Sequence, residues 1–257
     1  VSCFVAAYLG AGHLPEFAVN VPLLAPGLIG WSLFAGIFFG TVSVFHIECL
    51  HAVDKKFKSL RIPDWQKPLL GGAILLALSA LFGPRYLGLG MNTVDEAIRG
   101  YDLPVAAFAL KSFAMAVTLS CGGSGGVLTP TLFVGAAAGS LFGNLFGLDP
   151  SVGSALGLAG VLAGSTNTPI ASTILAMELF GAPIAPFAGL VCAVSYVVAG
   201  HRSLHPSQVM LRPKARTFVR RSVDGKSRIT GRFEGVSYGR IIRFHLEKVY
   251  SRIIKRK

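Results

Sequence analysis

The chain has 257 residues, of which 52% are apolar, 31 are glycine and 14% are charged, whereas charged residues make up roughly 25% of an ordinary soluble domain. Its mean hydropathy is +0.60, and several apolar segments approach the roughly 20 residues with which a helix crosses a bilayer. The chain is therefore predicted to be an all-α, polytopic membrane protein. This composition excludes a water-soluble globule, collagen, a coiled coil and an acidic disordered chain.

The net charge of +12 comes entirely from the C-terminal end. Residues 1–211 hold nine Lys/Arg and nine Asp/Glu, whereas residues 212–257 hold fifteen Lys/Arg and three Asp/Glu. Because Lys and Arg concentrate on the cytoplasmic side, we predict a transmembrane domain over 1–211 and a basic, poorly ordered cytoplasmic tail over 212–257, of a type that can also adhere to anionic lipid. Nucleic acid is not an expected partner, since no aromatic stacking platform or reading helix accompanies the charge.

The apolar segments predict a series of helices. After an apolar helix over 1–10 and an outer loop over 11–26, we expect helices over 27–57, 67–82, 91–100, 104–120, 130–147, 150–165, 169–181 and 183–199, and a last short element over 201–208. A basic loop with Lys55, Lys56 and Lys58 is expected to be cytoplasmic. Several of these helices are too short to cross a bilayer. Chain breaks at membrane depth survive only where protein buries them or where they line a polar cavity, so a solute pathway is predicted.

The Gly-rich stretch before Pro130 has the features of a helix start that binds an anion. The first amides of a helix lack intrahelical acceptors and carry about half a positive charge. Proline is tolerated in the first turn, and glycines leave no side chains over the approach. The predicted anion-binding residues are Gly126, Val127 and Leu128, with the amides of Val127 and Leu128 facing the ion. The alternative for Gly122–Gly126 is a turn between helices at the surface.

Two further glycine and proline patterns bear on helix placement. Asn167, Thr168 and Pro169 repeat the order of cap residue and proline, so a second helix is expected to begin inside the membrane. Helix N-termini that point at an anion in mid-membrane are a known transporter arrangement. Glycines recur every four residues along one helix face and are predicted to allow close packing of a neighbouring helix: Gly135, Gly139, Gly143 and Gly147.

Two charged residues fall within apolar helices. Lys111 either raises the electrostatic potential along an anion route, or pairs internally or extends to the interface, and the sequence leaves these alternatives open. Glu178 lies near the end of a short helix and is expected to be paired or near an interface rather than part of a proton path.

No metal, cofactor or enzymatic centre is expected. The cysteines stand singly, at Cys3, Cys49, Cys121 and Cys192. One group resembles metal ligands, but on a helix His51 leaves the face that His46 and Cys49 share, and polar residues at a membrane exit explain the group better. An intramembrane enzyme would need a paired nucleophile and base, and the sequence offers none.

Four blocks occur in an order and spacing that resemble one known family. The run Gly125–Pro130, with the sequence Gly-Gly-Val-Leu-Thr-Pro, resembles the Gly-x-x-x-Pro helix-start motif of the CLC chloride channels and chloride/proton antiporters. Gly160–Gly164, Asn167–Ile170 and Met177–Glu178 resemble its next blocks. The similarity covers residues 1–211 and implies a CLC-type bundle of tilted, broken and partly re-entrant helices, corresponding to the second inverted repeat and flanking helices.

The resemblance also implies a function. It implies a homodimer in the cell membrane, with one pathway per subunit for chloride or a similar anion, coupled to protons in the antiporters. His205 falls where the family usually has a tyrosine whose hydroxyl touches the central anion. An imidazole can donate a hydrogen bond and an imidazolium attracts an anion more strongly, so His205 is predicted to bind the anion with pH-dependent affinity, or else to cap or pack at a helix start. Fluoride-exporting relatives tend to carry an acid where this chain has Val127, which favours chloride.

Some family features lie outside the resemblance. The motifs that supply a central serine and a gating glutamate, and the proton-accepting acid of the exchangers, belong to the first repeat, so channel and antiporter are not distinguished. The chain starts at Val1 within an apolar run, and we expect that an N-terminal part precedes it. The alternatives are another broken-helix secondary transporter, for fluoride or an organic anion, or a fragment that does not transport.

Overall fold

The computed structural model describes residues 26–205, 218–223 and 226–233. Two compact units divide the chain, Val1–Pro206 and Ser207–Lys257. The described part of the first unit consists of helices and the turns that join them, as the all-α prediction requires. The helix expected over 1–10 and the loop expected up to residue 25 lie outside the described residues.

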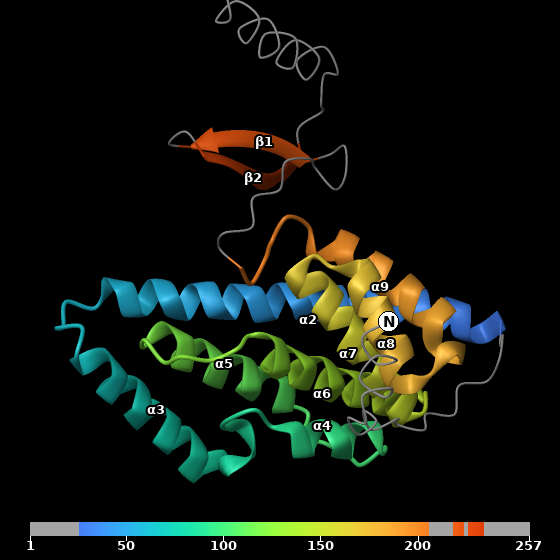
Figure 1. Ribbon diagram of the computed structural model, residues 1–257, viewed down its shortest axis with the longest axis horizontal. Coiled ribbons are helices and arrows are strands. Elements are labelled where there is room, and N and C mark those ends of the chain that lie inside the picture. Colours follow the sequence, from blue (N-terminus) through green and yellow to red (C-terminus); the bar gives the residue numbers. More distant parts are fainter. Residues whose placement is uncertain (1–25, 206–217, 224–225, 234–257) are drawn as a thin grey trace, which may run out of the picture. The chain divides into compact units, whose positions relative to one another are not determined.

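The helices of the first unit match the predicted segments to within a few residues (Figure 1). In chain order they are α2 (Pro26–Ser59), α3 (Gln66–Phe82), the 3-10 helix η1 (Pro84–Tyr86), α4 (Met91–Ile98), α5 (Ala107–Ser120), α6 (Leu128–Phe146), α7 (Pro150–Thr166), α8 (Pro169–Phe180), the 3-10 helix η2 (Ala182–Ile184) and α9 (Ala185–Ala199). The last predicted element is not a helix in its described part, residues 201–205, and residues 206–208 lie outside the described residues.

Glycine and proline mark the ends of these helices. Gly83 and Gly181 follow α3 and α8 with φ values of 87° and 86°, a region that glycine adopts without strain. Pro150 and Pro169 stand in the first turns of α7 and α8, where a missing N–H costs nothing. The breaks between short helices therefore follow directly from residue type.

Helices α6 and α7 pack with their backbones in contact. A Cβ atom built on Gly135 would lie 2.6 Å from the carbonyl oxygen of Gly157, so the two backbones are in direct contact. Gly139 and Gly143 likewise face the backbone of α7 or of the turn before it, which confirms the predicted packing for these three glycines. The prediction is wrong for Gly147, which ends α6 in the left-handed region (φ 70°) with no atom near its Cβ position.

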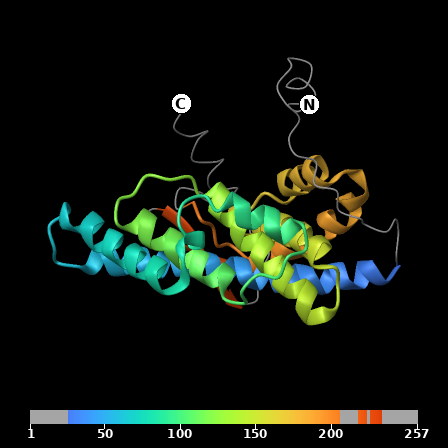
Figure 2. The same ribbon diagram turned by 90° about the horizontal axis from the view of Figure 1, so that it is seen from below.

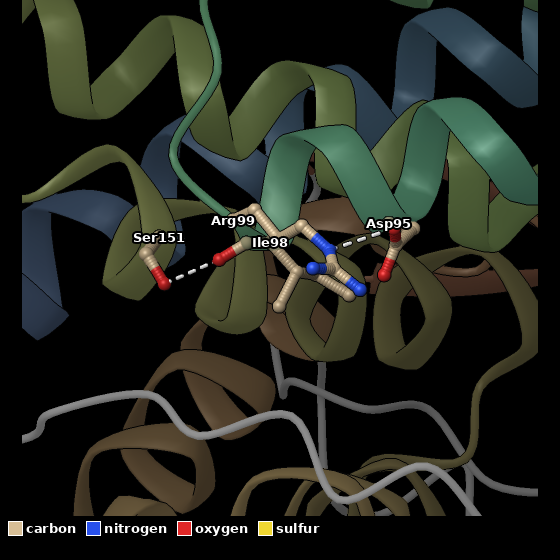
Figure 3. A network of polar contacts seen from close by, with 4 residues as sticks. All are labelled: Asp95, Ile98, Arg99 and Ser151. Atoms are coloured by element: carbon tan, nitrogen blue, oxygen red, sulfur yellow. Dashed lines mark hydrogen bonds and ion pairs between the residues drawn. The ribbon is translucent and has the colours of Figure 1, made fainter.

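The long helix α2 organises the first unit. It packs against α5, α6, α7 and α9, and both views show it lying along the bundle (Figures 1 and 2). From the turn that follows α2, α3 returns to pack on α5. The short helix α4 packs on α6 and α7; Ser151 Oγ at the start of α7 donates to the carbonyl of Ile98 at 2.5 Å, beside an ion pair between Arg99 and Asp95 (Figure 3).

Three described helices are long and apolar enough to cross a membrane: Gly27–Ser59, Leu128–Phe146 and Ala182–Ala199, the last of which includes η2. The helices α3, α5 and α8 are apolar but shorter. This mixture of long and short apolar helices is the pattern that the sequence predicted for chain breaks at membrane depth.

The second unit contains a hairpin that the sequence analysis did not predict. Strands β1 (Phe218–Val223) and β2 (Lys226–Phe233) pair antiparallel, with an irregularity between Phe218 and Val219. Five of the fourteen residues in these strands are Arg or Lys, and this density of charge hides the usual apolar signal of a strand. The hairpin lies within the tail over 212–257, and the expectation that this tail is poorly ordered stays a prediction.

Candidate functional site

The start of α6 has the geometry that the sequence predicted for Gly126, Val127 and Leu128. The helix begins at Leu128, and its N-cap residue Val127 has helical dihedral angles (φ −83°, ψ −20°) and no capping side chain. Within residues 26–205, no backbone carbonyl accepts a hydrogen bond from the amide of Val127 or of Leu128. These N–H groups are therefore available to an external acceptor, and the helix dipole favours an anionic one.

This helix end is accessible from outside the bundle. The segment Gly122–Gly126 is irregular and exposed, Val127 is half-buried, and Leu128 is 51% exposed. Pro130, by contrast, is buried in the first turn. This exposure is compatible with both alternatives for the segment, an anion site and a surface turn. An anion site also needs free N–H donors, and the amides of Val127 and Leu128 provide them.

A buried hydrogen-bond network lies behind this first turn. Thr131 Oγ1 donates to the carbonyl oxygen of Val127 at 2.7 Å. On α2, His46 places Nε2 3.3 Å from Thr131 Oγ1 and Nδ1 2.8 Å from Ser112 Oγ of α5. Ser112 Oγ also lies 2.8 Å from the carbonyl oxygen of Phe108. Since His46, Ser112 and Thr131 are at most 1% exposed, the network ties the start of α6 to α2 and α5 without access to bulk water.

The environment of His46 corrects the sequence analysis. We expected His46, Cys49 and His51 to be polar residues at a membrane exit, but His46 is fully buried, whereas Cys49 is half-buried and His51 is exposed. In the described ranges, no group of three His, Cys, Asp or Glu side chains could hold a metal ion. The sequence did not reveal the network because Ser112 and Thr131 lie 66 and 85 positions after His46 in the chain. The available signal was a histidine inside an apolar helix.

Lys111 is buried and pairs internally. Its ammonium group donates to the carbonyl of Gly88 at 2.6 Å and to that of Tyr86 at 3.2 Å, and it lies 4.9 Å from the centroid of the Phe133 ring. Two carbonyl dipoles and an aromatic face compensate the charge. Among the alternatives for Lys111, these contacts correspond to internal pairing. They connect the turn after α3 to Lys111 of α5 and Phe133 of α6.

The predicted second helix start is confirmed. Thr168 is the N-cap residue of α8 and Pro169 stands in its first turn. The preceding Asn167 ends α7 in the left-handed conformation (φ 62°), which asparagine tolerates better than most residues, and its Nδ2 donates to the carbonyl of Arg202 at 3.0 Å. Glu178 is half-buried near the other end of α8, and within residues 26–205 no cation pairs with it.

His205 lies in a segment that is anchored to α2 and α7. The amide of the neighbouring Leu204 donates to the carbonyl of Ser165 at 3.0 Å, and its side chain packs in a small cluster with Ile47 and Ala116. His205 itself is half-buried. The segment thus contacts the same stretches of α2 and α5 that carry His46 and Ser112. No described hydrogen bond joins His205 to Val127 or Leu128.

An ion pair adds to this anchoring. Arg202 Nε lies 2.6 Å from Glu48 Oε1 of α2. Both side chains are about half exposed, 50% and 56%, so the pair contributes little free energy, of the order of 0–1 kcal/mol. The pair joins the segment after α9 to α2.

Comparison with known sequences gives one consistent result. The family described as voltage gated chloride channel matches residues 1–200. The chain is 30% identical over 191 residues to the chloride/fluoride channel protein of Pseudomonas syringae pv. tomato. The aligned region covers 69% of this chain and 42% of that protein. It is 32% identical over 186 residues to the voltage-gated ClC-type chloride channel ClcB of Escherichia coli O17:K52:H18. This second aligned region covers 68% of this chain and 44% of that protein. The chain therefore spans less than half the length of these curated relatives.

Comparison with solved structures agrees. A crystal structure of a CLC-type fluoride/proton antiporter superposes with a TM-score of 0.69 and 29% identity, over 79% of this chain and 52% of that one. The structure of a slow cyanobacterial Cl⁻/H⁺ antiporter has the same fold, with a TM-score of 0.55 and 22% identity, over 73% of this chain and 46% of that one. These superpositions confirm the predicted CLC-type fold of apolar helices and place the chain among membrane proteins. The family match over residues 1–200, together with these relatives, shows that the chain belongs to the voltage gated chloride channel (CLC) family.

Proposed function

We propose that the protein carries chloride or a similar small anion across a membrane, as a CLC-type channel or anion/proton antiporter. The observation that carries this proposal is the uncapped start of α6, where the amides of Val127 and Leu128 have no acceptor within residues 26–205. The membership of the CLC family and the names of the relatives, a chloride/fluoride channel protein and a ClC-type chloride channel, support it. No covalent chemistry is part of this function.

In this proposal the anion is held by backbone dipoles. Val127 and Leu128 donate their amide hydrogens, and Gly126 leaves the approach open because it has no side chain. Amides bind an anion without the full charge of a lysine or arginine, so the ion can also leave, as conduction requires. His205 is the proposed second contact, from the segment that Leu204 anchors to α7.

Fluoride is the second candidate anion. The Pseudomonas syringae relative is a chloride/fluoride channel protein, and the antiporter structure with 29% identity is a fluoride/proton antiporter. Against this, the residue after Gly126 is the apolar Val127 rather than an acid. We therefore propose chloride as the preferred ion and fluoride as the competitor to be measured beside it.

The proposed assembly is a homodimer that forms through α8 and α9. Helices α8 and α9 follow one another in the chain, joined by η2, and pack against each other. Even so, three apolar side chains on them are at least half exposed: Ile170 (76%), Ile174 (50%) and Val197 (53%). They line a shallow groove of about 440 Å³. An apolar surface of this kind suits a second copy of the chain within the membrane, where close packing drives helix association.

The proposed orientation puts the basic segments in the cytoplasm. The loop after α2 with Lys55, Lys56 and Lys58 and the tail over 212–257 both carry an excess of basic residues. The distribution of Lys and Arg sets the orientation of membrane proteins, and anionic lipid of the inner leaflet attracts such segments.

Flux through liposomes tests the proposal. The protein at its natural length is reconstituted in vesicles loaded with chloride, and efflux is recorded with and without a proton gradient. Anion efflux that a proton gradient can drive would identify an antiporter, and efflux that ignores the gradient would identify a channel. The same vesicles loaded with fluoride rank the two anions. Vesicles that retain both anions would overturn the proposal.

A further inference from the structure

The turn between α2 and α3 carries a cluster of positive charge that the proposed anion site does not use. We call residues 54–67, which include the last turns of α2 and the start of α3, the α2–α3 corner. Five basic against two acidic side chains give the corner a net charge of +3. The basic residues are Lys55, Lys56, Lys58, Arg61 and Lys67.

Three of these cations have no ion pair. Both carboxylates of the corner are engaged, each at 2.6 Å by a basic residue three or four positions away: Asp54 by Lys58 and Asp64 by Lys67. Among the residues that the structure describes between 26 and 205, no carboxylate pairs with Lys55, Lys56 or Arg61. All three side chains are exposed. The corner therefore offers three cations to an external anionic group.

An exposed apolar surface adjoins these cations. Trp65, at the end of the turn, is 68% exposed, and Leu69, in the first turn of α3, is 66% exposed. Tryptophan side chains are enriched where a membrane meets water, because the ring is apolar and its N–H is polar. Cations next to apolar side chains match an amphiphile with an anionic headgroup and acyl chains. A nucleic acid or an acidic soluble protein would leave the apolar side of α3 unmatched.

The backbone of the corner is held in place by α5. Phe57 is 5% exposed and packs in a small cluster with Val117 and Cys121 at the end of α5. A Cβ atom built on Gly71 of α3 would lie 2.5 Å from Cys121 Sγ, so α3 lies directly against the same part of α5. Both helices that carry the basic residues are thus fixed before a ligand arrives, which lowers the entropy cost of binding.

We propose that the α2–α3 corner is a binding site for an anionic phospholipid. The headgroup phosphate lies beside Lys55, Lys56 and Arg61, and the guanidinium group can donate two hydrogen bonds to it. The acyl chains lie along Trp65 and Leu69. Basic segments in general attract anionic lipid, but here charge and apolar surface on a fixed backbone define one place for one lipid. This inference goes beyond anion transport and does not depend on it.

Photo-crosslinking to lipid tests the site. The protein at its natural length, with Trp65→p-benzoylphenylalanine, is reconstituted in vesicles of equal amounts of phosphatidylglycerol and phosphatidylcholine, and the attached lipid is identified by its mass. We expect about fivefold more phosphatidylglycerol than phosphatidylcholine, the effect of one cation at a membrane surface. Leu76→p-benzoylphenylalanine is the matched control, because Leu76 lies further along α3 and is 71% exposed. We expect equal labelling by the two lipids there.

Charge variants assign the preference to the corner. The combined variant Lys55→Gln, Lys56→Gln and Arg61→Gln changes only exposed side chains, and we expect it to fold and to label both lipids equally through position 65. Arg61→Lys keeps the charge and is expected to retain the preference. Arg99→Gln on α4 removes a cation that is 65% exposed outside the corner, and we expect it to behave as the wild type.

Three results would overturn the proposal. The first is equal labelling of both lipids through position 65 when all cations are present. The second is a preference for phosphatidylglycerol that survives in the combined variant, since another basic segment would then be its source. The third is loss of the preference when soluble glycerol phosphate is added, which would show a site for free phosphate. None of these measurements involves chloride flux, so the proposed function is tested separately.

Discussion

Gly139 on α6 and Gly153 on α7 face each other so closely that neither could carry a side chain. A Cβ atom on Gly153 would lie 2.5 Å from the carbonyl oxygen of Gly139, and a Cβ atom on Gly139 would meet the carbonyl of Gly153. Backbone atoms cannot move aside as a side chain can. This contact sets the distance between α6 and α7, and α6 begins with the proposed anion site.

The first prediction concerns this contact. Gly139→Ala must push the two helices apart, and we expect a loss of stability of roughly 1–3 kcal/mol, as for other overpacked interiors. Gly72→Ala on α3 is the matched control, because no atom lies within 4 Å of its Cβ position. Thermal unfolding in detergent measures both variants. Equal melting temperatures for the two would show that the glycine contact is not a constraint.

The second prediction concerns access to the start of α6. Gly126 has open space around its Cβ position, so Gly126→Leu is expected to fold normally. Its side chain would stand over the amides of Val127 and Leu128, and we expect chloride efflux from liposomes to fall about tenfold, as a loss of about 1.4 kcal/mol of binding would produce. Gly30→Leu on α2, which also has open space, serves as the control. Unchanged efflux in Gly126→Leu would argue that the anion binds elsewhere.

The third prediction distinguishes the two roles considered for Lys111. Lys111→Met leaves the buried carbonyls of Tyr86 and Gly88 without a donor, and each unpaired group costs roughly 1–3 kcal/mol. We therefore expect a clear drop in the unfolding temperature, with chloride affinity of the folded protein unchanged. The exposed Lys58→Met is the control for loss of a positive charge. A lower chloride affinity with normal stability would instead indicate that Lys111 acts on the anion route.

The fourth prediction concerns His205 as the second anion contact. His205→Tyr keeps a hydrogen-bond donor at the end of a long side chain, and we expect transport to persist. His205→Phe has no donor, and the loss of one hydrogen bond of about 0.5–1.5 kcal/mol should weaken chloride binding several-fold. Whatever part of the pH dependence comes from His205 disappears in both variants, because neither new side chain titrates near neutrality. Identical affinities in the two variants would show that His205 only packs against its neighbours.

The fifth prediction tests the proposed dimer. A cysteine in place of Ile170 on α8 should allow a short bifunctional maleimide to join two copies in the membrane, since Ile170 is 76% exposed. Leu76 on α3 is similarly exposed, at 71%, and Leu76→Cys is the control. The wild type measures the background from the native cysteines. Cross-linking that is as strong through residue 76 as through residue 170 would place the interface elsewhere.

The sequence by itself predicted the helix boundaries between residues 26 and 199 to within a few residues, and it predicted the helix start at which the anion site is proposed. Helix ends follow from local properties, namely the φ freedom of glycine at Gly83 or Gly181 and the place of proline in a first turn, so they could be predicted without knowledge of packing. The start of α6 at Leu128, with its bare amides, was predictable for the same reason. Length and hydropathy were enough to identify a membrane protein.

Only the tertiary structure decided which polar residues act together. His46, Ser112 and Thr131 come from three helices and meet because α2 packs across α5 and α6; no pattern of neighbouring residues encodes that meeting. The same holds for Lys111, whose carbonyl partners lie 23 and 25 positions away in the chain. Backbone hydrogen bonding and residue shape act over one turn of a helix, whereas the partner of a buried polar side chain depends on how distant segments pack.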